Sequence, residues 1–104
     1  MSDSKFDEYG IDTQQRLNLE TAQIGWDELQ RFYAGGSLVV VDTSLDLVEV
    51  AAGFVEDKSE YIAGLMEAGH VRKAVDDDAR RWQAEQRSFW AVVAAPFVLV
   101  QETT

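Results

Sequence analysis

Three carboxylates in the middle of the chain come closest to a chemical motif. Asp42 follows a run of β-branched residues, and Asp46 and Glu49 follow at a spacing that brings all three near the start of one helix. Oxygen-rich clusters of this kind suit Mg²⁺ or Ca²⁺. Asp46 and Glu49 also lie opposite the apolar stripe of that helix, where a solvated charged face is expected. Asp42, Asp46 and Glu49 are therefore candidate metal ligands, with the solvated face as the favoured interpretation.

A second acidic run, Asp76-Asp77-Asp78, has a structural explanation. Consecutive side chains point in different directions, which is a poor arrangement for ligands around one ion. Asp76 can cap the helix that follows, and the other two acids interact favourably with the positive end of its dipole. The chain also lacks the Asp-x-Asp-x-Asp-Gly pattern of a calcium loop. We expect these acids to start a helix, and we predict no cofactor.

Other catalytic chemistries lack the residues that they require. The chain has no Cys, which excludes disulfides, thiolate catalysis and zinc–thiolate sites. Its one His, His70, follows Gly69 and is expected in a surface turn. There is no Gly-x-Ser-x-Gly elbow and no phosphate-binding loop, since Gly35-Gly36 precedes a predicted strand instead of following one. These absences favour a non-catalytic protein, with an enzyme as the weakest hypothesis.

Charged and aromatic side chains point instead to contacts with proteins. The stretch from Asp42 to Glu67 has seven acids and one base, whereas the stretch from Arg72 to Arg87 has five bases and four acids. Opposite patches in one small domain can support a homodimer or docking to another protein. Trp82 and Trp90 flank a polar turn, where one of them can be partly exposed. The candidate interface residues are Trp82, Trp90, Arg80 and Arg81.

The same composition limits other partners. The net charge of −10 repels phosphate backbones, so we predict no nucleic-acid binding. The longest apolar run, residues 89–100, is shorter than the roughly 20 residues that cross a bilayer, and Pro96 interrupts it. The beginning of the chain lacks the basic and apolar regions of a signal peptide. We therefore expect a cytoplasmic protein that does not enter a membrane.

Helices and a small sheet have to position these residues. Apolar spacing in residues 13–34 predicts either one helix kinked at Gly25 or two short helices, with two favoured. The other predicted helices are 45–55, 57–69 and 77–87, and the predicted strands are 37–41, 71–75 and 89–101. Thr43 and Asp46 have the spacing of a capping box. The last strand is apolar at both parities, which is typical of a central strand, and Pro96 marks a bulge or bend in it.

This order predicts an α+β fold with a small mixed three-stranded sheet packed by four to five helices. The two helices between the first and second strands favour an antiparallel relation between them. The single helix between the second and third strands favours a parallel relation with a right-handed crossover. We expect a single domain over residues 13–104, after a flexible tail at residues 1–12.

Several stretches, taken in order, resemble a known bacterial family. They are Leu17-Asn18-Leu19-Glu20-Thr21-Ala22, Ile24-x-Trp26-x-Glu28-Leu29-Gln30-Arg31-Phe32, Leu45-Asp46-Leu47-Val48-Glu49-Val50-Ala51-Ala52, Phe89-Trp90-Ala91-Val92-Val93 and Pro96-Phe97-Val98-Leu99-Val100-Gln101. From about residue 13 to residue 102 the chain resembles the family known as domain of unknown function 2288. The resemblance implies a stand-alone bacterial cytoplasmic protein. It transfers no site, because that family has no assigned activity, substrate or catalytic residue.

The functional prediction is a small interaction or regulatory module without catalytic activity. It depends on the absence of catalytic motifs and on the uneven distribution of charge. The second hypothesis is a protein that binds a small molecule or a divalent cation on its acidic helix face.

Overall fold

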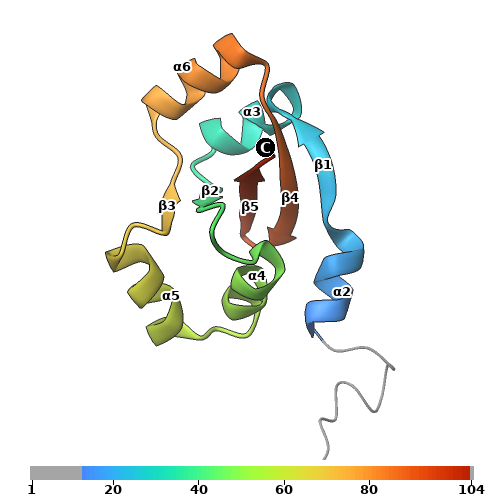
Figure 1. Ribbon diagram of the computed structural model, residues 1–104, viewed down its shortest axis with the longest axis vertical. Helices are drawn as coiled ribbons and strands as arrows, with labels where there is room; N and C mark the ends of the chain where they lie inside the picture. Colours follow the sequence, from blue (N-terminus) through green and yellow to red (C-terminus); the bar gives the residue numbers. More distant parts are fainter. Residues whose placement is uncertain (1–12, 104) are drawn as a thin grey trace, which may run out of the picture.

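The strands form one five-stranded sheet, and helices cover both of its faces (Figure 1). The structure is a computed structural model that describes residues 13–103, so the predicted tail at residues 1–12 lies outside the described residues. The elements are α2 (Thr13–Glu20), β1 (Ala22–Gly25), α3 (Trp26–Ala34), β2 (Leu38–Val41), α4 (Leu47–Val55), α5 (Ser59–Glu67), β3 (Val71–Lys73), α6 (Asp76–Glu85), β4 (Ser88–Ala94) and β5 (Phe97–Glu102).

The sheet is mixed and has the strand order β1-β4-β5-β2-β3. The pair β2–β5 is parallel, and the other neighbouring strands are antiparallel. The predicted α+β class is confirmed, and residues 13–103 contain five helices, within the predicted range. The prediction of three strands is wrong, because the sequence pattern hides two of the five.

One hidden strand is the second half of the last apolar run. Residues 89–101 were expected to be a single strand, but they form the β4–β5 hairpin, with Ala95-Pro96 in the turn. Helices cover both faces of this hairpin, so apolar residues occur at both parities in each strand and no polar segment separates them. Pro96 lies in the turn itself. Its lack of a backbone N–H therefore removes no hydrogen bond between the two strands.

The other hidden strand is β1, which lies inside the predicted helical region. The alternative with two helices is confirmed, and Gly25 is the N-cap of α3. Between the two helices, Ala22–Gly25 pairs with β4, where Ile24 lies opposite Phe89. This strand is four residues long and mostly exposed, so its sequence carries little periodic signal. Its pairing with β4 decides its conformation, as often happens in strands.

The predicted strand directions are partly confirmed. β2 and β3 are antiparallel neighbours, as expected from the two helices between them. β3 and β4 run in the same direction, but they are not neighbours, because β5 and β2 lie between them. The parallel neighbour of β2 is β5 instead, so the C-terminal ends of β2 and β5 lie at the same edge of the sheet.

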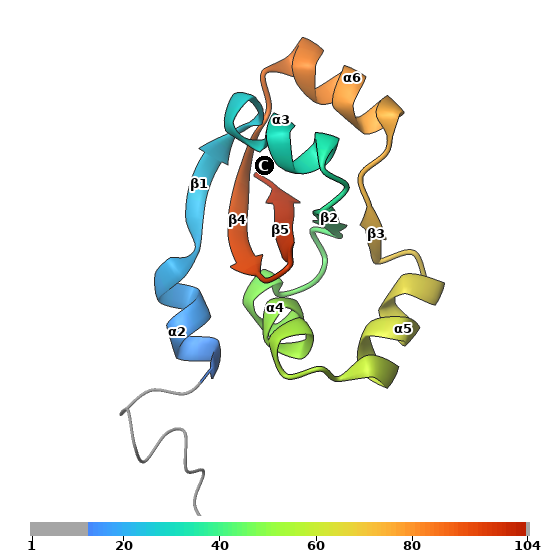
Figure 2. The same ribbon diagram turned by 180° about the vertical axis from the view of Figure 1, so that it is seen from behind.

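An apolar core covers each face of the sheet. In β2, Val39 and Val41 pack with residues of α2 and α4, whereas Leu38 and Val40 pack with residues of α3 and α6. Figure 2 shows the same arrangement from behind, with α2, α4 and α5 at one end and α3 and α6 at the other. Trp82 of α6 is fully buried in the second core. No helix among residues 13–103 has the length and hydropathy of a membrane-spanning segment.

The start of α4 differs in detail from the prediction. Asp46 is the N-cap, and its Oδ1 accepts hydrogen bonds from the N–H groups of Val48 (3.0 Å) and Glu49 (3.3 Å). The predicted capping box of Thr43 and Asp46 is therefore wrong. Residues 42–45 form a turn first, which delays the helix, and Leu45 N–H donates to the carbonyl of Asp42 (3.0 Å).

Candidate functional site

Ionisable side chains gather where the parallel strands β2 and β5 end. Val40 lies opposite Arg72 of β3 and, on its other side, opposite Val100 of β5. Val40 and Val100 face α3 and α6. Side chains two residues apart in a strand share a face, so the residues two positions after Val40 and Val100 lie on that face as well. The ionisable residues on this face at the end of the sheet are Asp42, His70, Arg72 and Glu102. They line a cavity of about 300 Å³.

Asp42 and His70 form a direct pair at this edge. His70 Nδ1 is 3.0 Å from Asp42 Oδ2, and the other carboxylate oxygen accepts from Ser44 N–H (3.2 Å). The hydrogen bond from His70 lowers the pKa of Asp42, and the Ser44 N–H lowers it further. Gln101 Nε2 donates to the carbonyls of Asp42 (2.9 Å) and Leu45 (2.7 Å), which holds the loop against β5.

Arg72 is held by a buried carboxylate from α6. Asp78 is 6% exposed, and it accepts from Arg72 Nη1 (2.6 Å) and Nη2 (3.0 Å) and from Val75 N–H (2.9 Å). The Arg72 hydrogen bonds are the main cause of the lowered pKa of Asp78, and they raise the pKa of Arg72. This clamp ties the first turn of α6 to β3.

Glu102 makes the corresponding connection between α6 and β5. Its Oε2 accepts from Arg81 Nη2 (2.8 Å) and from Trp82 Nε1 (3.1 Å). The hydrogen bond from Arg81 is the main cause of the lowered pKa of Glu102, and the Trp82 N–H adds to it. Arg72 and Glu102 are thus each oriented by partners on α6.

The candidate metal ligands have other roles in the structure. Asp42 pairs with His70, Asp46 caps α4, and Glu49 is exposed on the same helix. Within residues 13–103, no group of three or more His, Cys, Asp or Glu side chains is arranged to hold a metal ion. The structure therefore does not bring Asp42, Asp46 and Glu49 together as ligands.

The candidate interface residues also separate. Trp82 is fully buried, with its ring centroid 5.4 Å from that of Trp26 and 4.9 Å from that of Phe89, so it has no surface to offer a partner. Trp90 of β4 is 43% exposed, in agreement with the expectation that one of the two is partly exposed. Arg80 and Arg81 are exposed on α6, where they pair with Asp77 and Glu102 respectively.

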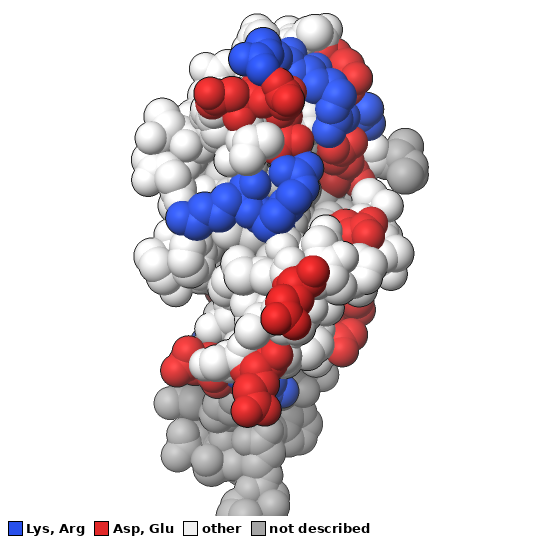
Figure 3. Space-filling view, turned by 90° about the vertical axis from the view of Figure 1, so that its left-hand side faces the viewer, with Lys and Arg blue, Asp and Glu red and all other residues white. Residues whose placement is uncertain are grey.

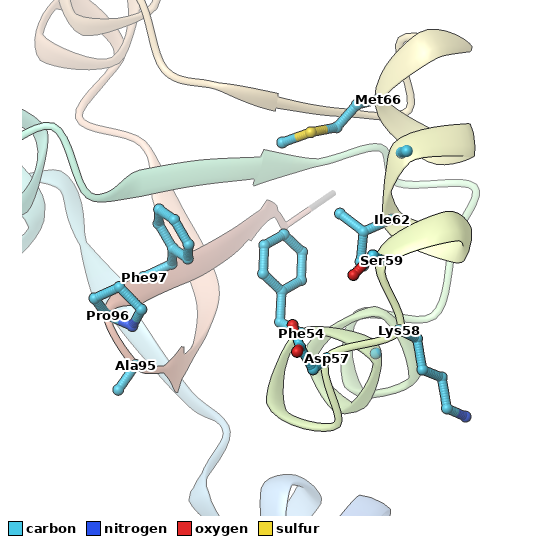
Figure 4. Close-up of a pocket in the computed structure, with 11 residues that line it drawn as sticks. Phe54, Asp57, Lys58, Ser59, Ile62, Met66, Ala95, Pro96 and Phe97 are labelled. Carbon is cyan, nitrogen blue, oxygen red and sulfur yellow. The ribbon is translucent and has the colours of Figure 1, made fainter.

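A second cavity, of about 440 Å³, lies between α4, α5 and the β4–β5 turn (Figure 4). Figure 4 shows Ile62 and Met66 of α5 pointing across it toward Phe54 of α4, with Phe97 on the far side. The rings of Phe54 and Phe97 are 5.6 Å apart and meet edge to face. Lys58 lies at the rim and points away. The walls of this cavity are mainly apolar, unlike those of the cavity at Asp42.

Helix α5 covers this cavity loosely. None of its residues is buried. Met66 is 43% exposed, and Tyr61 is also exposed. Ile62 and Leu65 pack, half-buried, against the core that α4 and the sheet form. The apolar side chains of α5 are therefore only partly covered.

The two charged stretches of the sequence have different environments. Basic residues gather over β3 and α6 in Figure 3, but each of Arg72, Arg80, Arg81 and Arg87 has a carboxylate partner within the chain. The acidic stretch on α4 and α5 has a single base, Lys58, which lies 3.4 Å from Glu56. Its excess of negative charge is therefore not neutralised locally.

Comparisons with other proteins identify the family. Residues 12–102 match the family model described as "Protein of unknown function (DUF2288)". The chain belongs to the DUF2288 family. It is also similar to the solution NMR structure of PA1075 from Pseudomonas aeruginosa, with 40% sequence identity and a TM-score of 0.78, over 92% of this chain and 90% of that one. None of the curated proteins matches the sequence.

The resemblance to the DUF2288 family that was seen in the sequence is confirmed. Sequence reasoning did not predict either of the two cavities described above in this DUF2288 chain. It placed His70 in a turn but could not pair it with Asp42, which lies 28 positions earlier. The available signal was the register of two antiparallel strands joined by a helical hairpin, since Asp42 and His70 each lie one residue beyond the pair Val41–Val71.

Proposed function

We propose that this DUF2288 chain is a non-catalytic protein-interaction module whose cavity between α4, α5 and the β4–β5 turn receives an apolar side chain from a basic segment of another protein. The observation that carries the proposal is an open, mainly apolar cavity beneath a helix without buried residues. Burial of one large side chain in such a cavity contributes about 1.5–3 kcal/mol. Anchors of this kind dominate many protein interfaces.

The charge around the cavity supports a basic partner. The chain from Asp42 to Glu67, which supplies α4 and α5, has seven acids and one base. A positively charged segment is therefore attracted before contact, and the attraction orients it along these helices. Arg80 and Arg81 of α6 do not compete for the acids of α4 and α5, because they already pair with Asp77 and Glu102.

A second copy of the chain suits this cavity less well. In a two-fold dimer the same patch meets itself, so the acidic helices α4 and α5 of the two copies would come together. The net charge of −10 per chain adds to that repulsion. Homodimer formation through another surface stays a prediction, and light scattering in dilute buffer tests it.

A titration with designed peptides tests the proposal. The probe is a peptide of about 15 residues, rich in Lys and Arg, with one central Trp, and ¹H–¹⁵N NMR spectra report the contact. We expect shifts centred on Phe54, Ile62, Met66 and Phe97, and weaker binding as salt is added. The Met66→Glu variant should lower the affinity at least tenfold.

Matched controls separate the cavity from general charge attraction. The Leu19→Glu variant adds the same charge at an apolar residue that is 76% exposed on α2, and it should bind the peptide nearly as the wild type does. A peptide with Ala in place of Trp should bind at least tenfold more weakly. The proposal is wrong if both peptides bind equally, if Leu19→Glu weakens binding as much as Met66→Glu, or if neither peptide binds at millimolar concentration.

A further inference from the structure

The cavity at the ends of β2 and β5 has a different chemistry from the apolar cavity. It is lined by residues from β2, β3, β5 and the loops beside them, including Asp42, Thr43, His70, Arg72 and Glu102. The ends of parallel strands are common ligand sites in sheets with helices on both faces. Arg72 and Glu102 lie on β3 and β5, and Asp42 and His70 lie in the loops next to the paired ends of β2 and β3.

The cavity retains hydrogen-bond donors on one side. An arginine side chain has more N–H groups than Arg72 uses with Asp78 and with the carbonyl of Lys73. The Arg72 side chain is about half exposed, so the remaining N–H groups are accessible. Such groups match the geometry of a carboxylate.

The cavity retains acceptors on the other side. A carboxylate can accept about four hydrogen bonds. Asp42 accepts one from Ser44 N–H and one from His70. Glu102 accepts from Arg81 and Trp82 through Oε2, and its Oε1 lies 3.6 Å from Arg87 Nη1, beyond hydrogen-bond distance. The free capacity of both carboxylates suits an ammonium group. The His70 ring nitrogen that does not contact Asp42 can also take part.

The partners of these groups hold them in place before any ligand arrives. Asp78 holds Arg72, Arg81 and Trp82 hold Glu102, and Gln101 holds the loop that carries Asp42. Side chains held in this way lose little conformational entropy on binding. These contacts dock α6 on the sheet and at the same time fix the cavity side chains, as a binding site requires.

Opposite charges side by side determine the class of ligand. A simple anion would meet the carboxylates of Asp42 and Glu102 on a protein with a net charge of −10, and a simple cation would meet Arg72. We propose that this cavity binds a small zwitterion, with its carboxylate on Arg72 and its ammonium group on Asp42 and Glu102, which is the chemistry of a free amino acid. The volume of about 300 Å³ limits it to a small molecule.

NMR titration with glycine and alanine tests this site. Each is added at up to 20 mM, with methylamine alone and acetate alone at matched ionic strength. We expect the zwitterions to shift the amides of Asp42, Thr43, His70 and Arg72, with at least tenfold weaker binding of either single-charge compound. Equal binding of methylamine or acetate, or no shifts at 20 mM for glycine and alanine, would overturn the proposal.

Variants connect the shifts to the named groups. Asp42→Asn and Arg72→Lys should each weaken binding at least tenfold. The first removes the negative charge that faces the ammonium group, and the second removes the paired N–H donors that face the carboxylate. Thermal unfolding checks that each variant is folded, and His70→Gln provides a further variant that leaves the Asp78 clamp intact. Asp27→Asn, an exposed carboxylate of α3, should bind as the wild type does. Unchanged affinity in Asp42→Asn and Arg72→Lys contradicts the proposal, whatever the basic peptide does at the apolar cavity.

Discussion

The acids Asp76, Asp77 and Asp78 are identical in type and adjacent in sequence, yet the structure predicts different effects of neutralising them. Asp78 is 6% exposed and accepts three hydrogen bonds, two of them from Arg72. Asp77 is exposed and pairs with Arg80, about one turn further along α6. Substitution of each by Asn removes one charge and hardly changes the volume. The comparison therefore isolates the effect of burial on a carboxylate.

We expect Asp78→Asn to lower the free energy of unfolding by about 2 kcal/mol. Hydrogen bonds to a charged group contribute about 1.5–3 kcal/mol each, but Arg72 is about half exposed and regains water when it is released. An Asn also retains one acceptor oxygen. For Asp77→Asn the expected change is below about 0.5 kcal/mol, because exposed ion pairs contribute little. Urea unfolding followed by tryptophan fluorescence at pH 7 measures both.

The difference should also depend on pH in one direction. Arg72 lowers the pKa of Asp78 in the folded protein, so its stabilising effect is complete above the pKa of an unfolded aspartate, about 3.9. As the pH falls below that value, wild-type Asp78 takes up a proton on unfolding, and the effect is lost progressively. Wild type and Asp78→Asn should therefore converge in acid. Equal effects of the two substitutions at pH 7, or a gap that widens in acid, would refute the reasoning.

Two further comparisons test the packing. Leu29→Ala, at a fully buried position of α3, should cost about 2–5 kcal/mol, whereas Leu19→Ala at an exposed position of α2 should change the free energy of unfolding by less than about 0.5 kcal/mol. Gly53→Ala should destabilise by about 1–3 kcal/mol, since a Cβ there would lie 2.8 Å from the Tyr61 ring. Gly64→Ala, where a Cβ meets nothing within 4 Å, should stabilise α5 by up to about 1 kcal/mol. Chemical denaturation measures all four, and equal signs for the two glycine variants would contradict the packing of α4 on α5.

The sequence predicts those elements whose pattern repeats at the period of one structure. The best example is α4, whose apolar residues recur at helical spacing and whose Leu47 and Ala51 are buried as the pattern requires, although Val55 at its end is exposed. β2 is a short β-branched run between turn residues, and it is a strand within one residue of the predicted range. The local sequence is sufficient in both cases. The buried stripe of α4 appears as apolar residues at helical spacing, and the two buried faces of β2 appear as a continuous apolar run.

The missed elements depend on partners that are distant in sequence. β1 is defined by its pairing with β4, and nothing in Ala22–Gly25 itself requires a strand. The hairpin β4–β5 has helices on both faces, so the alternation that would separate its strands is absent. The candidate sites depend even more on residues that are distant in sequence. The cavity at Asp42 forms only when β2, β3 and β5 pair in the correct register, and the apolar cavity forms only when α5 packs near Phe97.

Charge shows why a count along the sequence predicts less than the pairing in space. Arg72 to Arg87 is the basic part of the chain, but its arginines hold α6 against β3 and β5 through Asp78 and Glu102. The excess charge that a partner meets is therefore the acidity of α4 and α5. Salt should act differently on the two groups, because it screens exposed charges over about 8 Å at physiological strength but reaches a buried pair poorly. Added salt should then weaken binding of a basic peptide while the stability contributed by Asp78 stays nearly constant, so the electrostatics of binding and of folding are separable in this protein.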